Sequence, residues 1–193
     1  MVRGEQHPAA HLQRDREQDS DLIQGEPDDR YLLRDDFNRG IRQLKDLGLT
    51  YDILIFEHHL PHVLEFVERH PDQVFVLDHI AKPRIRDRIL APWRENIQSL
   101  AKFPNVYCKL SGMVTEAAAR NWEEQDFQPY FDTVFGAFGP YRLLFGSDWP
   151  VCLTETTYQG WMSIIQRQIG SFSGSEQQAV MGGTAAHVYS LVP

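Results

Sequence analysis

The sequence predicts an α/β fold built on parallel strands, and two observations predict it. Short apolar runs alternate four times with segments that have the spacing of amphipathic helices. A strand that returns to its sheet through a helix forms a parallel pair with a right-handed crossover. Each apolar run is also followed by polar side chains, as is typical of sites at the carboxyl ends of parallel strands in barrels and open sheets. The four runs are 49–56, 74–77, 106–112 and 142–145.

Length and composition restrict the class of protein. With 193 residues, 42% of them hydrophobic, the chain suffices for one domain with a sizeable core. The net charge of −8 and the lack of a Lys/Arg cluster argue against nucleic-acid and anionic membrane partners. No apolar run approaches the roughly 20 residues that cross a bilayer. The charge favours a small-molecule or protein partner instead, and we expect a small-molecule substrate. Cys108 and Cys152 form no CxxC pattern, so we expect a cytoplasmic protein.

Residues 1–22 are polar and have no apolar period, so we expect a disordered leader ahead of a domain at 23–193. The domain begins with an amphipathic helix, whose apolar residues recur at spacings of four and three. Asp35 or Asp36 is expected to cap the start of this helix, and Gly48 to end it. The apolar stripe is Phe37, Ile41, Leu44 and Leu47.

Proline and apolar spacing predict the remaining helices. Pro61 suits the first turn of a helix that runs to His70, after the first strand. Pro92 and Trp93 open another helix, after the second strand. Three more helices are expected at 125–138, 158–169 and 175–191.

Polar residues that could take part in chemistry follow all four strands. Asp148 would lie at the carboxyl end of the last strand, although a Ser-Asp turn that caps a following helix is the alternative. Ser111 has neither a nucleophile-elbow sequence nor a base nearby in sequence, which argues against a serine nucleophile. The full set is Glu57, His58, His59, Asp78, His79, Lys109, Ser111 and Asp148.

Several of these residues have structural alternatives. We expect Asp78 to hold a neighbouring backbone or the ring of His79 in position rather than to react. His58 and His59 fit a solvated loop, and either could supply a third metal ligand, but at most one of them can face inward. Lys109 fits either a partly buried lysine paired with Asp or Glu, or a pocket residue.

Three blocks of this sequence resemble the amidohydrolase-related lactonases, the group that contains fuconolactonase and rhamnonolactonase. The blocks are FVLDHIAKP at 75–83, NVYCKLSGMVTEA at 105–117 and RLLFGSDWPV at 142–151. Their order and rough spacing agree with the family. Milder similarity upstream and in the closing helix extends the resemblance from Gly25 to Leu191.

The resemblance implies a metal-dependent-hydrolase barrel of the (β/α)8 type that opens the lactone ring of a small sugar acid through an activated water. It implies Asp148 as metal ligand or general base, and His79 as metal ligand or as the group that polarises the carbonyl. It implies that Lys109, Trp149 and Lys82 line the substrate pocket. The expected cofactor is a divalent metal, with zinc as the first candidate.

The amino-terminal part departs from the family pattern. The family begins with a strand that carries a His-x-His pair, whereas His7 and His11 here are separated by three residues in a polar segment. A full barrel needs about 250 residues and eight strands, so we expect a partial barrel that lacks amino-terminal strands. Missing strands leave an open sheet edge through which another chain could associate. The alternative to an active lactonase is a catalytically inactive truncated product or a sugar-acid binding module.

Overall fold

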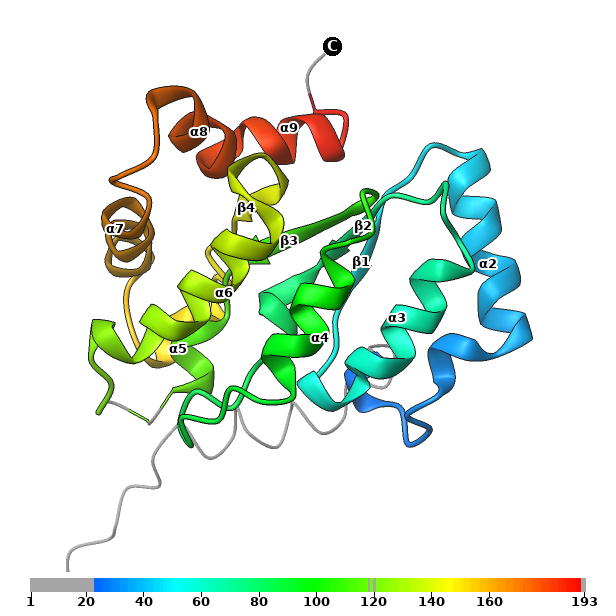
Figure 1. Cartoon of the computed structure of the whole chain (residues 1–193), viewed down its shortest axis with the longest axis horizontal. Coiled ribbons are helices and arrows are strands. Elements are labelled where there is room, and N and C mark those ends of the chain that lie inside the picture. The colour runs from blue at the N-terminus through cyan, green and yellow to red at the C-terminus, as the bar shows by residue number, and fades with distance from the viewer. Residues whose placement is uncertain (1–22, 118, 120, 192–193) are drawn as a thin grey trace, which may run out of the picture.

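The computed structural model describes residues 23–191 apart from 118 and 120, so the predicted leader at 1–22 lies outside the described residues. Four parallel strands form one sheet in the order β1-β2-β3-β4, which confirms the predicted α/β class (Figure 1). The strands are β1 (Tyr51–Ile53), β2 (Phe75–Leu77), β3 (Val106–Leu110) and β4 (Leu143–Phe145). β1 is shorter than the predicted run at 49–56, because only Tyr51–Ile53 pair with β2.

The register of the strands brings their carboxyl ends together. Ile53 lies opposite Leu77 in the first pair of strands. Leu77 in turn lies opposite Cys108, and Leu110 lies opposite Phe145. The segments that follow the four strands therefore leave the sheet at the same edge, as the sequence pattern predicted.

Helices connect the strands and succeed one another along the sheet (Figure 1). Those predicted after Pro61, from Pro92 and at 158–169 are confirmed, as is the helix predicted at 125–138, whose first turn is 3-10. No helix in the described part of the chain is long and apolar enough to span a membrane. The helices are α2 (Asp35–Asp46), α3 (Leu60–Glu68), α4 (Trp93–Leu100), α5 (Met113–Glu116), α6 (Gln128–Phe138), α7 (Tyr158–Gln168), α8 (Gly174–Gln178) and α9 (Thr184–Val188).

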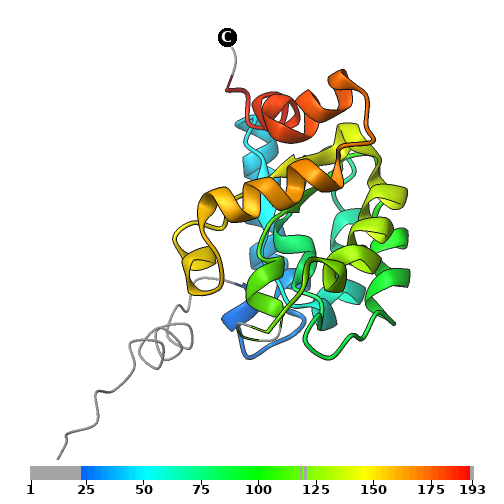
Figure 2. The same cartoon turned by 90° about the vertical axis from the view of Figure 1, so that its left-hand side faces the viewer.

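The last predicted helix, at 175–191, is interrupted. A π-helical turn at Ala179–Gly183 separates α8 from α9, and Gly182 within it leaves the helical conformation. Two adjacent glycines weaken a helix because they lose the most backbone freedom on folding. α8 and α9 follow each other along the same end of the molecule, as the dark-orange and red segments of Figure 2 show.

The start of α2 also differs from the prediction. Arg34 is the N-cap residue, and both predicted caps, Asp35 and Asp36, lie within the first turn. The carboxylate of Asp36 pairs with the guanidinium of Arg34 at 3.0 Å and accepts a hydrogen bond from the backbone N–H of Phe37 at 2.9 Å, so it acts from within the first turn rather than as the N-cap. Gly48 follows the helix with a φ of 67°, as expected of a terminating glycine.

Side chains alternate between the two faces of the sheet. In β3, Val106, Cys108 and Leu110 are buried in the main apolar core, which also contains side chains of α3, α4 and α6. The intervening Tyr107 and Lys109 are only partly buried and point to the other face. That second face carries a small apolar cluster, formed by Val76, Leu144 and Val188 with Tyr107, Ala185 and Tyr189 packed against it.

Candidate active site at the carboxyl ends of the strands

The chain adopts an unusual turn directly after β2. Residues 79–82 have φ values of 51°, 48°, 62° and 47°, so four consecutive non-glycine residues are left-handed. This conformation costs roughly 1–2 kcal/mol per residue for L-amino acids. Complete burial of Ile80 and Ala81 helps to offset the cost, as does the 2.7 Å hydrogen bond that Trp93 Nε1 donates to the carbonyl of Ile80. Backbone strain that the surrounding structure enforces is typical of functional sites.

The turn presents the ring of His79, and the end of β3 holds it. Nδ1 of His79 lies 2.7 Å from the hydroxyl of the buried Ser111. Gly112 follows with a φ of 68°, and a Cβ at this position would lie 2.7 Å from the Cβ of His79. Glycine is therefore needed there both for the conformation and for the space. Ser111 is completely buried, so it orients the imidazole instead of meeting a substrate.

Asp148 approaches the same ring from the end of β4. Its Oδ1 lies 3.7 Å from Nε2 of His79, and the two side chains are 13% and 16% exposed. The preceding backbone is fixed by Trp161, whose indole nitrogen donates to the carbonyl of Gly146 at 2.8 Å. The capping alternative is not supported, because the 3-10 helix at Val151–Thr154 has Pro150 as its N-cap and no side-chain cap.

The His79–Asp148 pair has the donor types and the spacing of metal ligands. A distance of 3.7 Å is too long for a hydrogen bond. It is close to the roughly 3.3 Å that separates two ligands of a tetrahedral ion with metal–ligand distances of about 2.0–2.1 Å. Catalytic zinc usually has three protein ligands. No group of three candidate ligands among the described residues includes His79 or Asp148, so the pair fits two ligands of a divalent ion.

A charged network lies next to the pair, on the second face of the sheet. The ammonium of Lys109 is 2.5 Å from Oδ1 of Asp78 and 2.9 Å from Oδ2 of Asp52. The hydroxyl of Tyr189 donates to Asp52 at 2.7 Å. Burial lowers the pKa of Lys109, but the carboxylates of Asp78 and Asp52 outweigh it and raise this pKa above its ordinary value. Lys109 is therefore a charged, partly buried lysine paired with two carboxylates, and its place in a substrate pocket stays a prediction.

The prediction for Asp78 needs correction. Asp78 pairs with Lys109 rather than holding a neighbouring backbone or the ring of His79, which Ser111 holds instead. The reason is positional, since β2 and β3 are neighbours and the side chain of Lys109 reaches across to the end of β2.

Comparison with known proteins decides the family. The sequence model of the amidohydrolases matches residues 20–191. The chain belongs to the amidohydrolase family. It is 42% identical over 180 residues to L-fucono-1,5-lactonase of Burkholderia multivorans, an alignment that covers 88% of this chain and 61% of that protein. It is 37% identical over 147 residues to L-fucono-1,5-lactonase of Burkholderia ambifaria, over 74% of this chain and 50% of that protein.

This amidohydrolase also resembles a solved structure. A crystal structure of a Burkholderia multivorans amidohydrolase with bound zinc aligns with a TM-score of 0.83 and 38% identity, over 100% of this chain and 73% of that chain. The predicted family is confirmed. The chain spans 61% and 50% of the length of the two curated lactonases.

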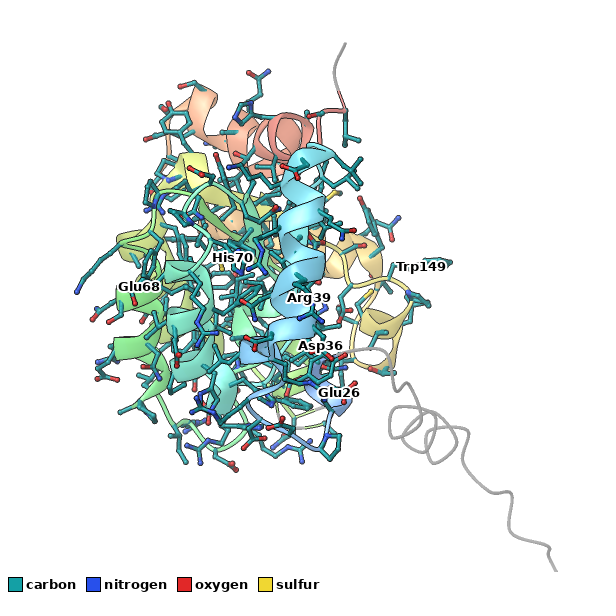
Figure 3. All side chains as sticks on the ribbon, turned by 90° about the vertical axis from the view of Figure 1, so that its right-hand side faces the viewer. Glu26, Asp36, Arg39, Glu68, His70 and Trp149 are labelled. Atoms are coloured by element: carbon teal, nitrogen blue, oxygen red, sulfur yellow. The ribbon has the colours of Figure 1, made fainter. Side chains whose placement is uncertain are left out.

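Lys82 and Trp149, two residues predicted to line a pocket, differ in their surroundings. The ammonium of Lys82 is 2.5 Å from Oε1 of Gln24 and 5.2 Å from the centre of the Phe56 ring. Trp149, which follows Asp148 in the chain, is 65% exposed, and its side chain projects outward from the molecule (Figure 3). Their contact with a substrate stays a prediction.

The histidines after β1 differ from each other. His59 is 2% exposed and lies with its Nδ1 3.2 Å from the backbone nitrogen of Phe56, so the predicted solvated loop is wrong for this residue. The side chain of His58 is 56% exposed, which agrees with the expectation that at most one of the two faces inward. Both approach Asp29, and no local sequence pattern indicates this proximity.

Proposed function

We propose that this amidohydrolase hydrolyses a lactone of a small sugar acid. The convergence of His79 and Asp148 from the ends of β2 and β4 carries the proposal, because a carboxylate beside an oriented imidazole suits acyl transfer to water. The substrate class comes from the two similar proteins named L-fucono-1,5-lactonase.

Asp148 is the proposed general base. Its carboxylate is largely shielded from solvent, and it accepts a proton from the attacking water. The oxygen of that water bonds to the carbonyl carbon, and the ring C–O bond breaks. The leaving oxygen takes the proton that Asp148 received, so the product is an open-chain hydroxy acid and the carboxylate is regenerated.

His79 is the proposed carbonyl-polarising group. The Ser111 hydroxyl donates to Nδ1 in the tautomer that this role requires, so Nε2 carries a proton and faces the region of Asp148. A donor fixed in this way stabilises the negative charge that develops on the carbonyl oxygen. The strained turn at 79–82 prevents the ring from relaxing to another position.

A divalent metal is the alternative form of the proposal. In the other tautomer of His79, Nδ1 donates to Ser111 and Nε2 keeps its lone pair, so His79 and Asp148 would be two of the ligands of this ion. Zinc is the first candidate because the similar Burkholderia multivorans structure holds zinc. A bound divalent ion would lower the pKa of a water molecule and polarise the lactone carbonyl.

We infer that Lys82, Trp149 and Lys109 line the substrate pocket. Lys82 and Trp149 flank the pair in the chain, three residues after His79 and one after Asp148. The ammonium of Lys109 is already paired with two carboxylates, so it contributes shape and fixed polarity to the pocket floor instead of a free charge.

The proposal extends to the domain that contains the site and to its location in the cell. We propose that residues 23–193 form one domain and part of a (β/α)8 barrel. Within the described residues, β1 and β4 each pair with one strand, and such edges can accept a strand from another chain.

The buried free thiols of Cys108 and Cys152 fit a reducing compartment, so the cytoplasm is the proposed location.

Hydrolysis of a panel of aldonolactones, followed with a pH indicator, tests the function. We expect turnover by the parent chain and a loss of about 10²–10⁴-fold in Asp148→Asn, the usual contribution of a general base. Asp132→Asn, a surface change on α6, is the matched control and keeps the parent rate. Thermal unfolding of each protein shows whether the fold is intact.

A cooperatively folded parent that opens none of the lactones would overturn the proposed activity and favour a sugar-acid binding module. Full activity in Asp148→Asn would leave the activity standing and refute the role of this carboxylate.

A further inference from the structure

A second set of candidate metal ligands lies at the end of β1. It consists of Asp29, His58 and His59, and none of the three belongs to the His79–Asp148 pair. Within the described part of the chain, this is the only group of three or more His, Cys, Asp or Glu side chains whose ligand atoms lie within 4.8 Å of one another. Asp29 comes from the turn ahead of α2, whereas the two histidines belong to the 3-10 helix after β1.

The distances within this set suit coordination. Oδ1 of Asp29 lies 3.8 Å from Nε2 of His58 and 3.6 Å from Nε2 of His59. Both distances are too long for hydrogen bonds, so direct hydrogen bonding does not explain the convergence of the three groups. Two ligands of tetrahedral zinc are about 3.3 Å apart, so both distances to Asp29 are within about 0.5 Å of this spacing. The three ligand atoms all lie within 4.8 Å of one another.

His59 has a tautomer that suits a ligand. Its Nδ1 lies 3.2 Å from the backbone nitrogen of Phe56 and 3.3 Å from the carbonyl of the same residue, so it accepts from the N–H in one tautomer and donates to the carbonyl in the other. Metal binding would select the second tautomer, in which Nε2 faces Asp29 with its lone pair. A backbone carbonyl is a usual second partner of a metal-bound histidine. Burial of His59 lowers its pKa and so favours the neutral imidazole, the form that binds metal.

The set is open to solvent on one side. The side chains of Asp29 and His58 are 64% and 56% exposed, so an ion could reach them and keep a water molecule as a further ligand. The rings of His58 and His59 lie with their centres 3.9 Å apart, which places both imidazoles beside one carboxylate. Two imidazoles and a carboxylate suit Zn²⁺ better than Mg²⁺ or Ca²⁺, which prefer oxygen ligands.

We propose that Asp29, His58 and His59 bind one zinc ion, separate from any ion held by His79 and Asp148. Such an ion would tie the turn before α2 to the end of β1. The proposal does not depend on the lactonase activity, because none of its three residues is assigned a role in that reaction.

Titration of purified, metal-free protein with Zn²⁺ against a colorimetric zinc indicator tests the site. The titration is done in the Asp148→Asn background, which disables the other pair. We expect one equivalent of bound zinc, and affinity at least about tenfold weaker in Asp29→Asn and in His58→Ala, since even changes around a metal ligand cost 10–100-fold. Titration with Co²⁺ adds a spectroscopic signature of imidazole coordination that the same variants should lose.

His62→Ala and Asp46→Asn are the matched controls, and both should bind zinc like the parent. The exposure of Asp29 and His58 favours folding of their variants, and either one alone decides the outcome if the other fails to fold. Undiminished zinc affinity in the folded variant would overturn the proposal. The absence of a zinc equivalent in the parent, or equal weakening in His62→Ala, would overturn it as well.

Discussion

The two faces of the sheet are built from different chemistry. On the face with the main core, Phe75, Val106 and Cys108 are completely buried among apolar side chains. On the second face, Asp52 and Lys109 form ion pairs beside a much smaller apolar cluster. The first face therefore supplies most of the stability through apolar burial, whereas the second places charges that must be paired. The candidate active site lies at the strand ends, next to the charged network.

The largest effect is expected from a cavity in the main core. Phe131 of α6 is completely buried, with ring centres of Phe135 and Trp161 at 5.4 Å and 6.3 Å. Phe131→Ala should lower the free energy of unfolding by about 3–5 kcal/mol, as measured by urea denaturation. The partly buried Phe135 is the control, and its replacement by Ala should cost less. A loss below about 1 kcal/mol for Phe131→Ala would contradict the conclusion that the face with the main core supplies most of the stability.

A smaller loss of stability is expected on the charged face. Lys109→Met leaves the carboxylates of Asp78 and Asp52 without their cation. Removing one partner of a fully buried pair costs about 3–5 kcal/mol, and we expect roughly 2 kcal/mol here because water still reaches the network.

The double variant of Lys109→Met with Asp78→Asn sharpens this prediction. It removes the less exposed of the two orphaned charges and should recover part of the stability that the single variant loses. Urea denaturation of the parent, the two single variants and the double variant gives the coupling free energy. Simple additivity would mean that the Lys109–Asp78 pair contributes nothing specific to stability.

The smallest change in stability is expected from a neutral hydrogen-bonded contact among the helices, between His70 and Asn38. His70 is 7% exposed, its Nε2 lies 2.7 Å from Oδ1 of Asn38, and burial lowers its pKa. The unfolded state therefore binds more protons below about pH 6.5, and stability should decrease as the pH falls from there toward the lowered pKa. For one histidine the decrease is at most about 1.4 kcal/mol per pH unit.

His70→Gln isolates this contribution. The free energy of unfolding of the variant should change less between pH 7.5 and pH 5.5 than that of the parent, with urea denaturation at both pH values as the measurement. His59 titrates in the same direction and remains in both proteins, so some pH dependence should persist. An identical pH dependence in parent and variant would show that the helical layer tolerates a charge at His70.

Much of the fold could be predicted because the relevant signals are local. Apolar spacing located α2 and the strands, and proline located the first turn of α3, since these patterns depend on neighbours in the sequence. The helix at 175–191 was predicted as continuous because Gly182 alone does not show whether a glycine will be tolerated or will break a helix.

The candidate site was predictable only in part. The alignment of strand ends predicted that His79 and Asp148 would approach each other, and their side chains lie 3.7 Å apart. The contact between Ser111 and His79 could not be anticipated, because it depends on the left-handed turn after β2. The approach of Asp29 to the histidines after β1 likewise depends on the path of a loop, which no local pattern encodes.

The left-handed turn at 79–82 also reverses the usual ranking of substitutions. Elsewhere in a folded chain, replacing alanine by glycine loosens the structure. At Ala81, with a φ of 62°, glycine would instead relieve a steric penalty. Substitutions selected for thermal stability would therefore include glycine in this turn. The same substitutions would make the backbone that orients the imidazole of His79 more flexible. Thermal stability and catalytic activity therefore favour different residues at positions 79–82.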